Sequence, residues 1–179
     1  MTIAEDPACA VAQAETPTAP QEPRRLVVVF ATPVATHLQH FGRHLGYTTV
    51  LVEPSAAMSA PEADHSEAAD HVVTGAREAG IDASTDVVVT DHHRPELGPI
   101  LRDVLTLPAR WVGLMGSPRH VGPHVAALGE LGVDEQTIAR VHRPIGLNIG
   151  SRTPPEIAVA TLAGLLADRA GRPGGFRFD

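Results

Sequence analysis

Short runs of β-branched and aliphatic residues alternate along this chain with segments of helical periodicity, and this alternation limits the fold more than any other feature. The clearest runs are Leu26–Phe30 and Asp86–Thr90, whose nearly continuous apolar stretches are typical of strands buried on both faces. Strands that alternate with helices predict a parallel sheet covered by helices on both faces. We therefore expect an α/β protein with a doubly wound, Rossmann-like sheet.

The other elements are expected at regular intervals along the chain. We expect strands at 48–52, 71–73 and 111–115, and helices at 34–45, 95–107 and 134–139, with further helical material up to about residue 131 that Gly122 and Pro123 weaken in its middle. The last helix has the strongest start signal. Thr153 fits the N-cap, Pro154 fits the first helical position, and Glu156 completes a capping box.

The composition changes at the two ends of the chain. Glu, Pro, Ala, Thr and Gln dominate the first residues, a mixture that is typical of disorder. We therefore predict a disordered leader at 1–23, one Rossmann-like domain at 24–171 and a flexible tail at 172–179.

Charge and cysteine content exclude several classes of protein. A formal net charge of -7 argues against nucleic-acid binding, which relies on clustered Lys and Arg. The single cysteine, Cys9, excludes a disulfide framework and a thiolate metal cage. No stretch has the pattern of a signal peptide or the apolar length of a membrane span. We predict a cytoplasmic protein that binds neither nucleic acid nor membrane.

Ligands of open α/β sheets bind outside the carboxyl ends of the strands, so the turns there are the first candidates for a ligand site. The turn after the first strand, Ala31-Thr32-Pro33, lacks the glycines that let a dinucleotide pyrophosphate approach the backbone. Thr32 would cap the next helix, whose dipole still favours an anion. Glu53 ends the second strand, where a ribose-binding carboxylate would lie. An NAD(P)-dependent oxidoreductase with Thr32 and Glu53 in its cleft is therefore one alternative.

The turn after the strand at 111–115 is a better candidate for ligand binding. Gly116 allows close approach of a ligand, Ser117 can cap a helix or bind an oxyanion, and Arg119 can pair with a phosphate through two hydrogen bonds. His92 follows the strand at 86–90 and could serve as a polar partner near neutral pH.

The ten histidines do not form a recognisable metal or catalytic motif. His120 and His124 have the i, i+4 spacing that suits a metal, but neither a HExxH pattern nor a cysteine accompanies them. We therefore expect surface histidines and no metal site. The sequence also has no nucleophile elbow or P-loop, and we assign no catalytic residue.

Three blocks that occur in order carry a family resemblance. They are DVVVT (86–90) with the histidine that follows it, ARWVGLMGSPR (109–119), and IARVH (138–142) running into PIGLNIG (144–150) and TPPEIA (153–158). Together they resemble the C-terminal Rossmann domain of the XdhC/CoxI family, the accessory proteins of xanthine dehydrogenase and related molybdenum enzymes. The resemblance extends from Arg25 to Arg169.

The resemblance implies a protein that binds the molybdenum cofactor (molybdopterin), an anionic pterin carrying a phosphate, and delivers it to a xanthine dehydrogenase-type molybdoenzyme without turnover. It also implies a homodimer. Candidate cofactor-binding residues are then Thr32, Glu53, His92, Gly116, Ser117, Arg119, Asn148 and Arg152.

The sequence departs from the family pattern in several places. The first turn has no glycine, Asn148 stands where the family has Asp, and Pro118 stands where the family has a basic residue. The family's N-terminal domain has no counterpart here, so we expect a standalone relative. A further alternative is a ligand-free dimeric interaction module that docks through an apolar helix face, either 97–105 or 157–165.

Overall fold

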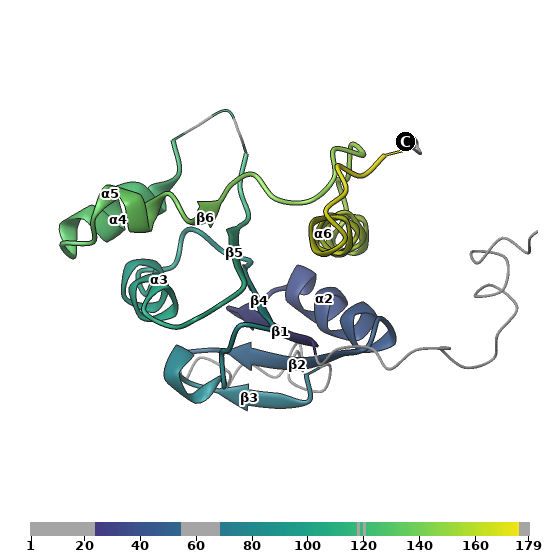
Figure 1. Ribbon diagram of the computed structural model, residues 1–179, viewed down its shortest axis with the longest axis horizontal. Coiled ribbons are helices and arrows are strands. Elements are labelled where there is room, and N and C mark those ends of the chain that lie inside the picture. Colours follow the sequence, from purple (N-terminus) through teal and green to yellow (C-terminus); the bar gives the residue numbers. More distant parts are fainter. Residues whose placement is uncertain (1–23, 55–68, 118, 120, 176–179) are drawn as a thin grey trace, which may run out of the picture.

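The computed structural model describes residues 24–54, 69–117, 119 and 121–175. Within them, six parallel strands form one sheet in the order β3-β2-β1-β4-β5-β6 (Figure 1). The strands are β1 (Arg24–Val29), β2 (Tyr47–Val52), β3 (His71–Val73), β4 (Thr85–Val89), β5 (Trp111–Leu114) and β6 (Val141–His142). This is the strand order of the Rossmann fold, so the predicted doubly wound α/β architecture is confirmed.

Helices cover both faces of the sheet. They are α2 (Pro33–His44), α3 (Leu97–Leu105), α4 (Pro123–Glu130), α5 (Glu135–Ile138) and α6 (Pro154–Arg169), with a 3-10 turn, η2 (Ala76–Glu78). Figure 1 shows α2 and α6 together on one side of the sheet and α3, α4 and α5 on the other. None of the described helices is long and apolar enough to cross a membrane.

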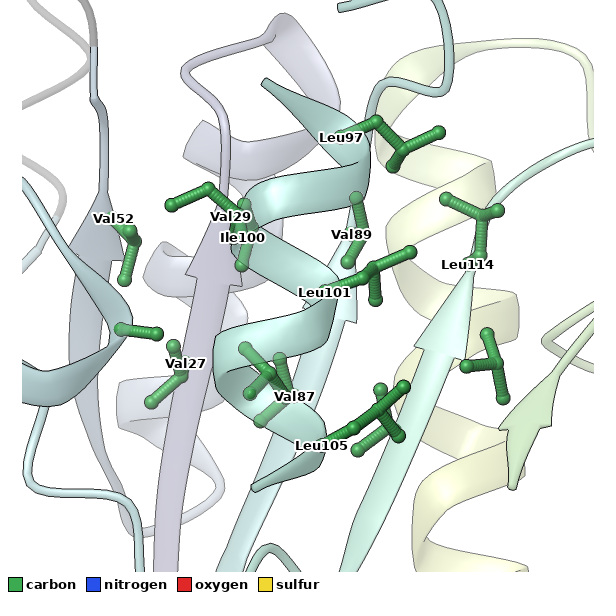
Figure 2. Close-up of a cluster of buried hydrophobic side chains, with 14 of the residues drawn as sticks. Val27, Val29, Val52, Val87, Val89, Leu97, Ile100, Leu101, Leu105 and Leu114 are labelled. Atoms are coloured by element: carbon green, nitrogen blue, oxygen red, sulfur yellow. The ribbon is translucent and has the colours of Figure 1, made fainter. Parts of the chain in front are cut away.

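The larger part of the core lies between α3 and the sheet (Figure 2). Alternate residues of a strand point to the same face of the sheet. Val29 of β1 and Val89 of β4 both point to the face that α3 covers, and they meet this helix side by side. The apolar residues of α3 that pack on them are Leu97, Ile100, Leu101, Val104 and Leu105, all buried. The idea that this helix face docks on a partner is therefore wrong, because the face is already covered by the sheet.

A second core lies under α2 and α6. Ala158, Leu162 and Leu165 of α6 are buried with Leu26 and Val28 of β1. The apolar face at 157–165 is therefore mostly internal as well, and that second docking face is also wrong.

Two local predictions need correction. The structure adds β6, a two-residue strand paired with β5, which is too short to show any hydrophobic period in the sequence. Gly122 and Pro123 do not weaken the middle of a helix; they begin α4, with Pro123 in the first turn, where its missing N–H costs nothing. Residues 1–23 and 176–179 lie outside the described residues, so the division into leader, domain and tail stays a prediction.

At the amino end of β4, a buried carboxylate joins the sheet to the end of α6. Asp86 is fully buried and accepts hydrogen bonds from Arg110 Nε at 2.6 Å and Arg169 Nε at 2.8 Å. The hydroxyl of Tyr47 donates a third, at 3.2 Å. Arg169 also donates to the backbone oxygen of Ser84. This network lies at the end of the strands opposite to the predicted ligand site.

Candidate ligand-binding site

The carboxyl ends of the central strands meet at one edge of the sheet. Backbone hydrogen bonds continue past the strands there, from Phe30 to Val52 at 2.9 Å, from Thr90 to Val29 at 3.1 Å and from Met115 to Val89 at 2.9 Å. The turns after β1, β4 and β5 are therefore adjacent. Strand order reverses between β1 and β4, the position where open α/β sheets bind ligands.

The turn after β1 is held by a helix cap and a buried aromatic ring. The Thr32 hydroxyl oxygen accepts a hydrogen bond from the backbone N–H of Ala35 at 3.1 Å, which confirms Thr32 as the N-cap of α2. Phe30 is fully buried at a φ of 72°, and no other non-glycine residue of the described chain has a positive φ. A bulky residue in this region is strained by roughly 1–3 kcal/mol, so packing around the ring must hold it there.

Glu53 is engaged inside the protein. Its carboxylate accepts from the backbone N–H of Ala31 at 2.9 Å and forms an ion pair with Arg94 at 2.9 Å, with only 3% of the side chain exposed. The hydrogen bond to Glu53 raises the pKa of Arg94, and the guanidinium of Arg94 also lies over the Phe30 ring at 4.8 Å. The position predicted for a ribose contact thus holds a carboxylate that already has a cationic partner.

Sequence reasoning did not single out Arg94. The feature that could have indicated it is the position of this arginine in the connection after β4, because that connection begins at the carboxyl edge of the sheet. Its pairing with Glu53 depends on the neighbouring turn after β2, which only the folded sheet brings close.

The turn after β5 has an exposed and a covered part. Ser117 and Arg119 are exposed, and the Ser117 hydroxyl oxygen accepts from the backbone N–H of Arg119 at 3.2 Å. Gly116 is partly covered by the guanidinium of Arg143: a Cβ built on Gly116 would lie 2.6 Å from Arg143 Nε. Arg143 directly follows β6 and was not predicted, because that strand was not recognised.

His92 is close to this turn. Its ring lies 4.1 Å from that of His93, and Met115 and Arg143 are among the groups around it. Burial first, and then the charges of His93 and Arg143, lower the pKa of His92. The lowered pKa favours the neutral ring, which has one nitrogen that donates a hydrogen bond and one that accepts.

His124 is not a surface histidine, contrary to the prediction. It lies on α4 and is only 6% exposed, because its ring packs against Gly122 beside Arg143. Burial and the charge of Arg143 lower its pKa. His120, its i, i+4 partner in the sequence, lies outside the described residues.

Asn148 and Arg152 lie in the connection between β6 and α6, and both are exposed. In Figure 1 this connection passes from the α4 side of the molecule to α6. It is attached to α6 by a hydrogen bond from the N–H of Leu147 to the oxygen of Ala160 at 3.0 Å, and Glu156 accepts from the N–H of Arg152 at 2.8 Å.

The structure therefore divides the predicted site residues into three sets. Thr32 and Glu53 belong to the turns after β1 and β2, His92 and Gly116 gather around Arg143, and the exposed set comprises Ser117, Arg119, Asn148 and Arg152. Within the parts of the chain that are described, no three His, Cys, Asp or Glu side chains are arranged to hold a metal ion.

A parallel six-stranded sheet in Rossmann order, with a polar edge at its topological switch point, defines a Rossmann-type α/β domain. The sequence matches the family model described as the XdhC Rossmann domain over residues 26–165. The chain belongs to this family.

The proteins similar to this chain include a relative from Escherichia coli and a solved structure from Bacillus halodurans. Over 75 residues the chain is 44% identical to the uncharacterized protein YqeB of Escherichia coli (strain K12). The matched segment covers 42% of this chain and 14% of YqeB. Its structure resembles that of a xanthine dehydrogenase (BH1974) from Bacillus halodurans, with a TM-score of 0.65, 23% identity and coverage of 87% of this chain and 46% of that one. The structural likeness shows the fold, and the chain spans less than half the length of either protein.

Proposed function

We propose that this domain binds the molybdenum cofactor and helps deliver it to a xanthine dehydrogenase-type molybdoenzyme, as an accessory protein without turnover. Membership of the XdhC Rossmann domain family over residues 26–165 is the observation that carries the proposal. The printed name of the solved neighbour, a xanthine dehydrogenase, is consistent with it.

The donor set at the carboxyl edge suits such a cargo. The cofactor is an anionic pterin with a phosphate, and Arg119, Arg143 and Arg152 all follow the ends of β5 or β6. Guanidinium groups bind phosphate through paired, charge-assisted hydrogen bonds, while Ser117 and Asn148 offer neutral donors for the polar edge of a pterin. The amino end of α2, capped by Thr32, adds a favourable dipole.

A nicotinamide dinucleotide fits this edge less well. The carboxylate of Glu53 would have to exchange its ion pair with Arg94 for a ribose hydroxyl, a charged partner for a neutral one. The turn after β1 has a buried Phe30, and Pro33 at the start of α2 has no N–H for a pyrophosphate. These contacts favour the accessory role over an oxidoreductase.

Cytoplasmic location and homodimerisation are further parts of this proposal. A dimer would let one domain present the cargo while the other contacts the acceptor enzyme. Native mass spectrometry measures the oligomeric state directly.

The same measurement tests the cargo. The protein is purified without oxygen from a molybdenum-replete host and, in parallel, from a host unable to make the cofactor. We expect a pterin mass on the first sample alone. We also expect Arg119→Gln to lower the pterin content without a change in circular dichroism, because the side chain is exposed.

A suitable control is Arg102→Gln, since Arg102 is exposed on α3. A nicotinamide mass in place of a pterin would refute the accessory role and support an oxidoreductase. Failure to find pterin in a folded sample from the replete host would refute cofactor binding by this domain.

A further inference from the structure

Arg143 lies where several connections meet at the carboxyl edge of the sheet. Its guanidinium rests against Gly116, where a built Cβ would come within 2.6 Å of two of its nitrogens. Its aliphatic stem rests beside Gly122, where a Cβ would come within 3.1 Å of Cδ. The two glycines therefore leave room for this one side chain, and a larger residue at either position would displace it.

His124 faces the same place. Its ring contacts Gly122 beside the stem of Arg143, and the side chain is more than nine-tenths buried. Its Nδ1 atom has no hydrogen-bond partner among the described residues. Buried polar atoms nearly always have partners, so this nitrogen points to a ligand atom.

His92 approaches from a third connection, the one after β4. Met115, the residue before Gly116, lies beside its ring. The charged or titratable groups that face it are Asp91, His93 and Arg143. Arg143 also faces His124, so a single cation acts on both imidazoles.

We propose that Arg143, His124 and His92 form a binding subsite for an oxyanion of the phosphate class at the carboxyl end of β5. A guanidinium offers two parallel donors to such an anion, and each imidazole offers one. The anion would supply a partner for His124 Nδ1. This inference rests on the site of the proposed function and names the residues there that would hold a phosphate, whether free or part of a larger ligand.

The test is a titration of the full chain with inorganic phosphate, followed by NMR of the histidine ring protons. We expect saturable shifts of the His124 and His92 signals, and a rise in the pKa of both rings as phosphate binds. Arg143→Gln should weaken phosphate binding about tenfold or more, as expected for the loss of a charge-assisted hydrogen-bond pair.

Arg102→Gln, on the exposed side of α3, is the matched control and should bind phosphate like the wild type. If Arg143→Gln does not fold, Gly116→Ala is used instead. It keeps the charge of Arg143 but moves the guanidinium, and it should also weaken binding.

Adenosine monophosphate and inorganic phosphate are compared in the same titration. Similar affinities assign the subsite to the anion alone, and tighter binding of the nucleotide assigns it to the phosphate of a larger ligand; both support the proposal. No saturable shift, or equal affinity in Arg143→Gln, overturns it. A protein that binds phosphate but captures no pterin would refute the cargo proposal and leave this subsite intact.

Discussion

Removal of the Asp86 carboxylate should be among the most damaging single changes to this domain. Asp86 is 0% exposed, and it accepts from Arg110 at 2.6 Å, from Arg169 at 2.8 Å and from Tyr47 at 3.2 Å. In Asp86→Ala, two guanidinium groups and a phenol would lose their shared acceptor in a place that water barely reaches. The junction between β4 and the end of α6 would lose its central contact.

The magnitude follows from the exposure of the partners. Breaking a buried ion pair by removing one member costs about 3–5 kcal/mol. The side chains of Arg110 and Arg169 keep 23% and 15% of their surface exposed and can partly rehydrate, which favours the lower end of that range. We therefore expect Asp86→Ala to lower the free energy of unfolding by about 3 kcal/mol, or the Tm by roughly 6–12 °C for a domain of this size.

Urea unfolding followed by circular dichroism measures this loss, and the slope against urea should not change. Two milder variants separate the contributions. Tyr47→Phe removes only the 3.2 Å hydrogen bond and should cost about 1 kcal/mol. Asp168→Ala removes the exposed partner of Arg110 and should cost about 0–1 kcal/mol. A loss below about 1 kcal/mol in Asp86→Ala, or one equal to that of Asp168→Ala, would contradict the reasoning.

Three further predictions concern the core, the last helix and pH. Leu101→Ala, which empties a fully buried position under α3, should cost about 3 kcal/mol in urea unfolding, while Arg102→Ala beside it should cost less than about 0.5 kcal/mol; similar losses would contradict the assigned core. Thr153→Ala removes the N-cap of α6 and should cost about 1 kcal/mol, with faster amide exchange confined to the first turn of that helix; uniform loss of protection would argue for another role. Because burial and neighbouring cations lower the pKa of His92 and His124 in the folded state, the unfolded chain binds protons more readily, and stability should fall as pH drops through 6.5 and below. A double variant with Gln at both positions should show a flatter dependence between pH 7 and 5 in urea unfolding, and an unchanged slope would exclude these two rings as the source.

Much of the fold could be predicted because its strands are buried on both faces. The runs at 26–30 and 86–90 have to be covered by helices on each side, which already implies a parallel sheet. The N-cap of α2 at Thr32 could be predicted too, because a cap is decided by residues within one turn.

The candidate site was less accessible to prediction. Glu53 was placed correctly at the end of β2, but its ion pair with Arg94 joins residues that are 41 positions apart. His124 has the same sequence context as an exposed histidine on a helix. Its burial depends on Gly122 and on Arg143, which directly follows β6.

The sequence by itself determined the class of fold and the edge of the sheet where polar turns collect, since both follow from hydrophobic periodicity and local capping. Only the tertiary structure decided which charges meet. The pairing of Asp86 with Arg110 and Arg169, and the gathering of Arg143, His124 and His92, depend on strand order and on which connections and helix ends meet at each edge of the sheet. Such contacts are non-local, and electrostatic interactions act over a few ångströms in space whatever the separation along the chain.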